Sequence, residues 1–232
     1  MIEKAAPSNQ VVDFSFEGAD FGYDKGVPHF FGRSLTPDEL EVLDVLLVYE
    51  MNGQPLLPQH GAPLRIIVPG WYGMASVKWL DRITALTDRY TGFQQVQTYR
   101  FRQTSDEVGE PVTAIRVKSL MVPPGVPDWI TRKRQLKSGL VRLEGRAWAG
   151  ATPIDRVEIH VGGDWHTAEL AEPLGEYAWR GWSFEWWAEP GHYRLACRAT
   201  DGEGNVQPLE SEWNLSGFAN NAVQQVEVFV TD

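Results

Sequence analysis

Three side chains that could bind an anion lie near one another in the first half of the sequence: His60, Arg65 and Lys78. Several glycines in the same stretch allow backbone to come close to a ligand. Arginine offers a planar pair of donors and lysine a compact charge, so together they suit a phosphate or another small anion. Neighbouring amides in residues 70–76, with Ser76 at the end, could add a backbone nest. The pattern predicts a site for an anionic cofactor.

The same residues also have structural interpretations. His60 could cap a turn, and Arg65 could form an ion pair with Glu50 or Asp81. Residue types and spacing alone leave these alternatives open.

The elements that would position these side chains are short. Two apolar runs, residues 46–49 and 64–68, predict buried strands on either side of a loop rich in proline and glycine. Residues 11–16 predict another strand, and residues 17–26 predict a loop. Before the first apolar run, Thr36 is followed by a proline and by a glutamate three residues on. This is a capping-box pattern, and it predicts a short helix that ends near residue 43.

Composition limits the class of protein. The chain has 232 residues, 43% hydrophobic content and a net charge of −10. A charge of this sign argues against nucleic acid or an acidic membrane surface as a partner. No run of 18 apolar residues and no signal-peptide pattern is present, so we expect no membrane span and a cytoplasmic location. The abundance of β-formers, with few long helical patterns, predicts a mainly β fold.

From residue 140 onward, short alternating segments recur with turn signals between them. This spacing predicts an antiparallel β-sandwich of immunoglobulin-like type. The expected strands lie within residues 140–150, 155–163, 166–170, 182–189, 192–200 and 223–230. Residues 122–139 contain prolines, glycines and a basic cluster at 132–134, and they predict a linker. The basic cluster is either a solvated loop or a contact with a partner.

The single cysteine, Cys197, lies in an alternating strand on the same face as Leu195 and Ala199. The opposite face carries Arg194 and Arg198, which must contact water. We therefore expect Cys197 to be buried, with a raised pKa and little reactivity.

Tryptophans are concentrated between residues 179 and 187. Trp182 and Trp186 share one face of a predicted strand, whereas Trp187 lies on the other. They suit a sandwich core and a dimer interface, where tryptophan is enriched. The alternative is a carbohydrate platform, which needs Trp179 and Trp187 exposed on one surface.

Several strings give the chain a family resemblance. YEMNGQPL, HGAPLR, VPG and VKWL, in this order, resemble the molybdopterin domain of the sulfite oxidase family of molybdenum-cofactor oxidoreductases. GRAWAG, IDRVEIHVGGDWHTAEL, RATDGEGNVQP and WNLSG resemble the dimerisation domain of that family, an immunoglobulin-like sandwich. The resemblance runs from about residue 42 to the end. It implies a partial molybdopterin domain at 1–121, a dimerisation domain at 122–232 and a homodimer.

The resemblance also implies roles for single residues. His60, Arg65 and Lys78 match the family positions that contact the pterin and its phosphate. Tyr99, by its spacing after VKWL, matches the active-site tyrosine. The implied reaction is transfer of an oxygen atom at molybdenum.

Two departures limit this carry-over. Family enzymes hold molybdenum through a cysteine in an earlier portion of the catalytic domain, and this sequence contains only Cys197. We therefore expect that an upstream cysteine-bearing segment completes the site and that residues 1–45 are partly disordered in the lone chain. Ser216 stands where sulfite-oxidising members carry a substrate-binding arginine, which suggests a bacterial branch with another substrate. The alternative function is a non-catalytic dimerisation or binding module.

Overall fold

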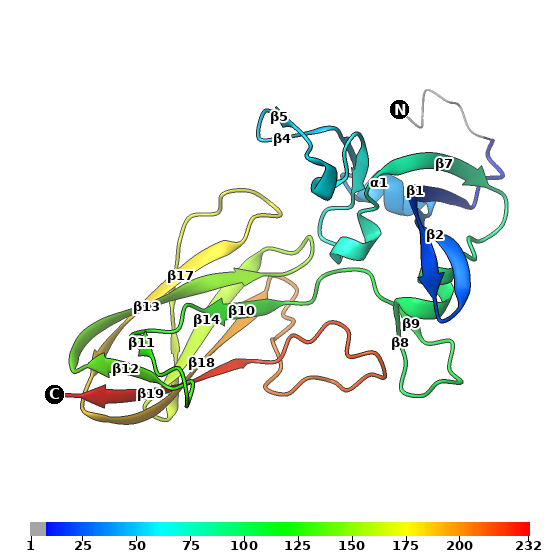
Figure 1. Cartoon of the computed structure of the whole chain (residues 1–232). Coiled ribbons are helices and arrows are strands. Elements are labelled where there is room, and N and C mark those ends of the chain that lie inside the picture. Colours follow the sequence, from blue (N-terminus) through cyan, green and yellow to red (C-terminus); the bar gives the residue numbers. More distant parts are fainter. Residues whose placement is uncertain (1–7) are drawn as a thin grey trace. The chain divides into compact units, whose positions relative to one another are not determined.

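The computed structural model describes residues 8–232, and the chain is mainly β with few helical turns (Figure 1). It divides into two compact units. Unit 1 comprises residues up to Ala114 together with Trp213–Phe218, and unit 2 comprises Ile115–Glu212 and Ala219–Asp232. The predicted domain limits at 1–121 and 122–232 stay a prediction. Within residues 8–232, no helix is long and apolar enough to span a membrane.

Unit 1 is built on an antiparallel sheet of three strands in the order β2-β1-β7. Strands β1 (Asp13–Asp24) and β2 (Val27–Leu35) form a hairpin, and β7 (Leu80–Leu86) pairs with the other edge of β1. Phe14 and Phe16 of β1 pack against Ile66 and Val77 in the core of this unit.

Short elements fill the rest of unit 1. Three antiparallel pairs are present: β3 (Leu46–Val48) with β6 (Arg65–Ile67), β4 (Glu50–Met51) with β5 (Gln54–Pro55), and β8 (Arg100–Phe101) with β9 (Glu110–Pro111). Turns of 3₁₀ helix occur at Pro58–His60 and Gly73–Ala75, and a π-helical turn occurs at Gln94–Thr98.

The predicted helix is confirmed as α1 (Pro37–Val42). The hydroxyl of Thr36 accepts a hydrogen bond from the amide of Glu39 at 3.1 Å, and the Glu39 carboxylate accepts one from the amide of Thr36 at 2.8 Å. Both bonds of the capping box therefore form, and the helix ends before Leu43, as expected.

Two expectations for the N-terminal region are wrong. Residues 17–26 were expected to form a loop, but β1 continues to Asp24 through an irregularity between Glu17 and Phe21. The expected partial disorder at residues 1–45 is not found at residues 13–35, which form a hairpin whose first strand, β1, also pairs with β7. The third strand comes from residues 80–86 of the same chain, which the sequence pattern there did not indicate. Residues 1–7, to which the same expectation applied, lie outside the described residues.

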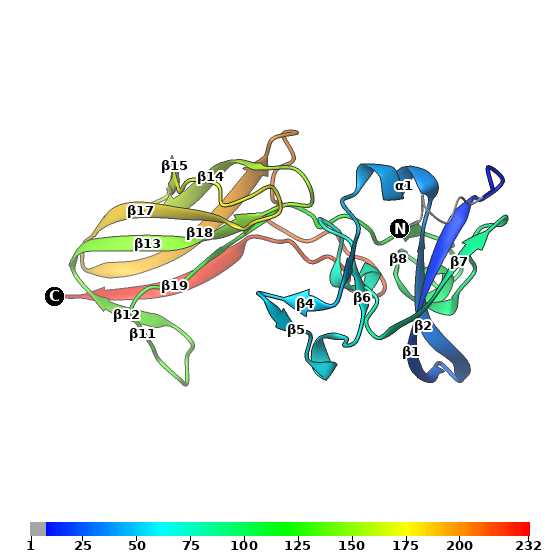
Figure 2. The same ribbon diagram turned by 90° about the horizontal axis from the view of Figure 1, so that it is seen from above.

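Unit 2 is the immunoglobulin-like sandwich that the sequence predicts, formed by two sheets. One sheet has the order β10-β13-β17-β16: β10 (Lys118–Met121), β13 (Gly139–Trp148), β17 (Arg180–Ala188) and β16 (Glu169–Leu170). The other has the order β11-β12-β19-β18-β14-β15: β11 (Val126–Pro127), β12 (Arg134–Lys137), β19 (Gln224–Thr231), β18 (Gly191–Asp201), β14 (Ile154–Val161) and β15 (Asp164–Thr167). Figure 2 shows the long strands of both sheets lying along one another. The predicted linker at 122–139 contains the β11–β12 hairpin.

The core of the sandwich lies between the two sheets. Leu143, Ile159, Leu195 and Cys197 are each no more than 1% exposed. Gln207 is also buried, and its side-chain oxygen accepts hydrogen bonds from the amide of Ser119 at 2.7 Å and that of Ala199 at 3.2 Å. A satisfied amide at this position links one sheet to the other.

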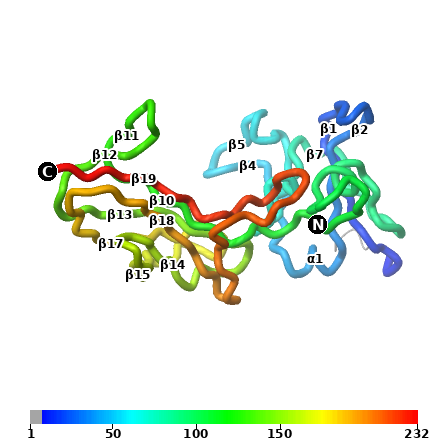
Figure 3. Tube along the Cα trace, turned by 90° about the horizontal axis from the view of Figure 1, so that it is seen from below, coloured from blue at the N-terminus to red at the C-terminus, as the bar shows by residue number. Residues whose placement is uncertain are grey.

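The segment between β18 and β19 returns alongside the approach to β10, as Figure 3 shows in orange-red and green. The side-chain amide of Asn221 donates to the carbonyl of Val117 at 3.1 Å, and Lys118 donates to the carbonyl of Asn220 at 2.7 Å. The middle of this segment, residues 213–218, belongs to unit 1.

Candidate functional site

Arg65 brings two loops of unit 1 together. Its Nη1 donates to the carbonyl of His60 at 3.0 Å, and its Nη2 donates to the carbonyl of Ser76 at 2.9 Å. Arg65 stands at the start of β6, so its side chain lies between the turn that precedes this strand and the turn that follows it. The structure therefore places His60, Arg65 and Ser76 in one hydrogen-bonded group.

Lys78, two residues after Ser76, binds the turn that contains His60. Its Nζ donates to the carbonyl of Gln59 at 3.0 Å and lies 4.4 Å from the centroid of the Trp79 ring. The indole of Trp79 in turn donates to the carbonyl of Pro58 at 2.8 Å. Gly61 has a φ of +101°, and a Cβ there would lie 2.8 Å from the Cβ of Lys78. A glycine is therefore required for this close approach. We call His60, Arg65, Ser76 and Lys78 the cation cluster.

Within residues 8–232, the cations of the cation cluster form no ion pair with a carboxylate. Among residues 8–232, neither Arg65 nor Lys78 forms an ion pair, and the ring of His60 forms no hydrogen bond. The alternative pairing of Arg65 with Glu50 or Asp81 is therefore not found. The Nε of Arg65 is buried without a hydrogen-bond partner, and burial lowers the pKa of Arg65. Unpaired cationic groups and an unbonded imidazole fit an anionic group with hydrogen-bond acceptors.

The predicted backbone nest at residues 70–76 is wrong in part. The amides of Trp71, Tyr72, Ala75 and Ser76 donate to carbonyls within unit 1. The hydroxyl of Ser76 accepts from the amide of Val68 at 3.1 Å. The amides of Ala75 and Ser76 are used by the 3₁₀ turn itself, and that of Tyr72 is used by the carbonyl of Thr113. Ser76 thus supports Arg65 through its carbonyl.

Sequence reasoning missed Asp20, which lies close to Lys78. The amide of Ala19 donates to the carbonyl of Trp79 at 2.9 Å, and a Cβ on Gly18 would lie 2.6 Å from the carbonyl oxygen of Lys78. Burial raises the pKa of Asp20, and the charge of Lys78 opposes this shift. The sequence signal for this approach is Gly18, which lets the backbone before Asp20 come close to Lys78. The prediction of a loop at residues 17–26 gave no reason to expect it.

Tyr99 directly follows the π-helical turn. Such π-helical turns are rare in proteins, and those that occur are often found at functional sites. The carbonyl of Tyr99 accepts from the amide of Val112 at 3.0 Å, and the next residue, Thr113, accepts from the amide of Tyr72 at 2.9 Å. The segment at 112–113 therefore connects Tyr99 with the turn after β6.

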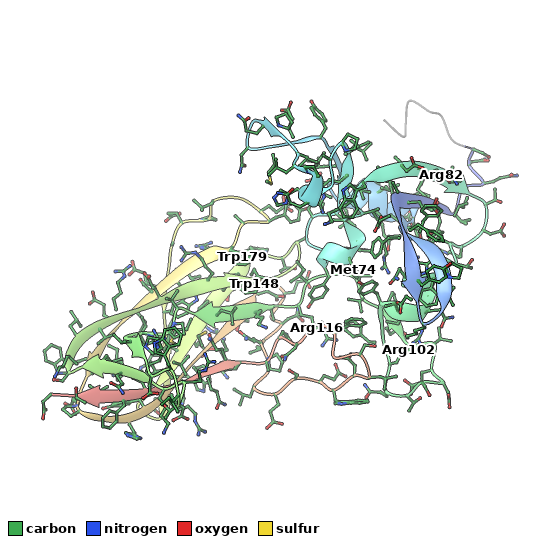
Figure 4. All side chains as sticks on the ribbon, viewed as in Figure 1. Met74, Arg82, Arg102, Arg116, Trp148 and Trp179 are labelled. Carbon is green, nitrogen blue, oxygen red and sulfur yellow. The ribbon has the colours of Figure 1, made fainter. Side chains whose placement is uncertain are left out.

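Ser216 lies near Tyr99 because residues 213–218, in the segment between β18 and β19, belong to unit 1. The amide of Leu215 donates to the carbonyl of Arg102 at 2.8 Å, and the ring of Phe218 lies 5.3 Å from that of Tyr99. Figure 4 labels Arg102 at this point. Tyr99 and Ser216, which were predicted separately, thus belong to one local structure in unit 1.

The cysteine belongs to unit 2, whereas the residues above belong to unit 1. Cys197 is 0% exposed in the core of unit 2, and burial raises its pKa to about 11, which confirms that it is a buried residue. Among residues 8–232, no group of three histidine, cysteine, aspartate or glutamate side chains could hold a metal ion.

The tryptophans divide between the core and the surface. Trp182 and Trp186 are buried, as expected, whereas Trp179 and Trp187 are exposed. Trp179 stacks on Trp148 at 4.4 Å with an interplanar angle of 17° (Figure 4). Hollows of about 380 and 470 Å³ border this pair.

Comparisons with known proteins agree with this arrangement. Residues 1–94 match the family described as the oxidoreductase molybdopterin binding domain, and residues 110–231 match the Mo-co oxidoreductase dimerisation domain. Human mitochondrial sulfite oxidase is 34% identical over 93% of this chain, and the Drosophila melanogaster enzyme is 31% identical over 97%. The chain spans 42% and 43% of the length of these two relatives.

A solved structure gives the same result for the fold. The sulfane dehydrogenase SoxCD from Paracoccus pantotrophus matches 96% of this chain and 56% of its own, with a TM-score of 0.80 and 25% identity. Both domain models, the sulfite oxidase relatives and this structural match agree. The chain belongs to the sulfite oxidase family of molybdopterin-dependent oxidoreductases.

Proposed function

We propose that this chain binds the anionic part of a molybdenum cofactor and serves an oxidoreductase of sulfite oxidase type. The observation that carries the proposal is the cation cluster, in which two cations and an imidazole are held together by backbone carbonyls and, among residues 8–232, form no ion pair. Lys78 has two ammonium protons beyond its bond to Gln59, and His60 has a free ring. Lys78, His60 and Arg65 would hold the pterin and its phosphate.

When bound, the molybdenum cofactor supplies two-electron oxygen-atom transfer. The protein's part is to hold the cofactor and to orient the substrate. Tyr99 would face the substrate and donate a hydrogen bond from its phenol to a substrate oxygen.

The substrate is proposed to differ from sulfite. Serine at position 216 offers a neutral hydroxyl, whereas a small dianion is best recognised by a guanidinium with two parallel donors. Ser216 lies in the segment that packs beside Tyr99, which supports a role in substrate choice. The bacterial assignment and the cytoplasmic location stay predictions.

The metal's thiolate is proposed to come from an upstream cysteine-bearing segment. Cys197 is enclosed by the sandwich core and has a pKa of about 11, so it is a poor candidate for a metal ligand. Such a segment would be a partner of this chain.

Self-association through the sandwich is proposed on the exposed apolar residues of β13 and β17. Trp187 is 68% exposed and lies opposite Leu140, which is 63% exposed. Trp187→Glu should lower the dimer fraction in sedimentation experiments, with Glu189→Gln as the control. An unchanged dimer fraction would exclude this face.

Cofactor analysis of the purified chain tests the proposed function. The chain is prepared alone and with a family segment that contains the cysteine, and molybdenum and pterin are measured. We expect pterin in both preparations and molybdenum chiefly in the second. Lys78→Met should lower pterin content roughly tenfold, whereas Lys133→Met, in unit 2, should leave it unchanged.

The competing function is a non-catalytic dimerisation or binding module. It would be supported if both preparations lacked pterin and Lys78→Met changed nothing. The buried Cys197 is the observation in favour of this alternative, since it leaves the described residues without a thiolate donor.

A further inference from the structure

Arg33 is a buried arginine without a carboxylate partner among residues 8–232. It lies in β2 and is 3% exposed. Its Nη1 donates to the carbonyl of Gln94 at 3.3 Å and its Nη2 to that of Val112 at 3.5 Å, while its Nε is buried without a partner. Burial lowers the pKa of Arg33 to about 10, so the guanidinium is charged at neutral pH. A buried charge with such incomplete compensation is costly and suggests a role beyond packing.

The two residues that accept hydrogen bonds from Arg33 also hold the backbone of Tyr99. The amide of Tyr99 donates to the carbonyl of Gln94 at 3.0 Å, and the carbonyl of Tyr99 accepts from the amide of Val112 at 3.0 Å. The central carbon of the guanidinium lies over the Tyr99 ring, 5.7 Å from its centroid. Arg33 therefore contacts both anchors of the Tyr99 backbone and faces its ring, a distance at which cation–π attraction operates.

Neighbouring residues of β2 hold the same π-helical turn. The amide of Ser34 donates to the side-chain oxygen of Gln95 at 2.8 Å, and the side-chain nitrogen of Gln95 donates to the Ser34 hydroxyl at 2.8 Å. These contacts fix the turn whether or not residue 33 is charged. The charge of Arg33 is thus a separate feature of the arrangement.

The surroundings of the Tyr99 ring are otherwise aromatic. Phe218 lies at 5.3 Å and Phe31 at 6.5 Å between ring centroids. Phe218 belongs to the same segment as Ser216, so that segment brings a ring and a neutral hydroxyl to this neighbourhood. Arg33 brings a positive charge to the same tyrosine.

We propose that Arg33 positions Tyr99 for the reaction and supplies the positive charge beside this tyrosine that Ser216 does not provide. The inference rests on the proposed function, because it assumes that Tyr99 faces the substrate. Arg33 is enclosed, so it acts through Tyr99 and through its field, which favours an anionic or electron-rich substrate group at the phenol.

Fluorine NMR on the full chain labelled with 3-fluorotyrosine tests the positioning without a cofactor. The Tyr99 resonance is assigned by its loss in Tyr99→Phe. We expect Arg33→Met to shift or broaden this resonance relative to the unsubstituted chain. Arg33→Lys should cause a smaller change, because it keeps a cation. Arg102→Met is the matched control, since Arg102 donates to the carbonyls of Val96 and Val108 in the same region. It should leave the Tyr99 resonance in place.

A folded Arg33→Met chain with an unchanged Tyr99 resonance would overturn the inference. If Arg33→Met does not fold, Arg33→Lys decides in its place: loss of the two-pronged hydrogen bonding should still broaden the resonance, and a sharp unshifted line would be the contrary result.

A double-mutant cycle tests the role of Arg33 in the reaction. It uses the chain loaded with molybdenum in the presence of the cysteine-bearing segment. We expect Arg33→Met to lower kcat roughly 10²-fold when Tyr99 is present and to have little further effect in the Tyr99→Phe background. Additive losses would contradict action through Tyr99. Absence of oxygen-atom transfer in the unsubstituted loaded protein would instead contradict the proposed function, and the NMR result would still decide whether Arg33 positions Tyr99.

Discussion

The guanidinium of Arg65 donates to the carbonyl of His60 at 3.0 Å, and this bond ties a predicted cofactor ligand to the backbone of another. The second amino group of Arg65 binds Ser76 in the same manner. Arg65 is therefore part of the framework of the cation cluster as well as a source of its charge. Lys78 contributes charge with less structural involvement, since among residues 8–232 its ammonium donates one hydrogen bond, to the carbonyl of Gln59. The two cations should respond differently to substitution.

Arg65→Met should lower the free energy of unfolding by about 1–3 kcal/mol, because the carbonyls of His60 and Ser76 lose a charged donor in a half-buried setting. Lys78→Met keeps most of the aliphatic stem and should cost less than about 1 kcal/mol. Urea unfolding, followed by circular dichroism, measures both. Equal losses for the two variants would contradict the framework role of Arg65.

Gly61→Ala and Gly53→Ala form a matched pair of glycine substitutions. Both glycines have positive φ, +101° and +72°, so alanine is strained at either position. A Cβ at Gly53 meets nothing within 4 Å, whereas a Cβ at Gly61 meets the Cβ of Lys78 at 2.8 Å. We expect Gly53→Ala to cost about 1 kcal/mol and Gly61→Ala about 3 kcal/mol in thermal unfolding. Gly61→Ala should also reduce pterin binding, because Lys78 must move. Similar costs for both substitutions would show that the contact with Lys78 is relaxed easily.

Cys197 should resist thiol reagents in the folded chain. Its pKa is raised from 9.0 to about 11 by burial, so the unfolded chain loses the thiol proton at a lower pH than the folded chain. Folding stability should therefore fall as the pH rises from 9 to 11, and Cys197→Ala should lack this component. Labelling with a chromogenic disulfide at pH 8 should be slow in buffer and complete within seconds in denaturant. Rapid labelling of the native protein would contradict the enclosed position.

Glu158 should contribute a pH-dependent increment of stability. The hydrogen bonds from Arg198, at 2.9 and 3.2 Å, lower the pKa of Glu158 below its ordinary value of 4.5. The increment is present above pH 4.5 and is lost as the pH falls through the lower pKa of the folded state. Glu158→Gln should reduce the free energy of unfolding by about 1 kcal/mol at pH 7, and the difference should shrink below pH 4.5. A difference that does not depend on pH would exclude the ion pair as its origin.

Local sequence signals were sufficient for part of the fold. The capping box at Thr36 and Glu39 forms as predicted, and the alternation around Cys197 identified its buried face. In both cases the decisive interactions involve residues close in sequence or a simple two-residue period.

Long-range pairing explains what the sequence did not reveal. The continuation of β1 past Glu17 depends on β2 and β7, and glycines in this stretch imitate a loop. Asp20 comes under the charge of Lys78 because the amide of Ala19 donates to the carbonyl of Trp79, although 58 positions of sequence separate Asp20 from Lys78. The contacts of Arg33 with Gln94 and Val112 arise in the same way. Periodicity cannot indicate such meetings, because it describes one element at a time.

Residues 213–218 belong to unit 1 although most of unit 2 precedes them in the sequence, and this order limits how the gene can be divided. A polypeptide that ended at Ala114 would lack Phe218, whose ring packs beside that of Tyr99. No single cut in the gene separates the two units cleanly. Exchange of the span after residue 114 would remove Phe218 from the Tyr99 ring of unit 1, so unit 1 and residues 213–218 should be inherited together.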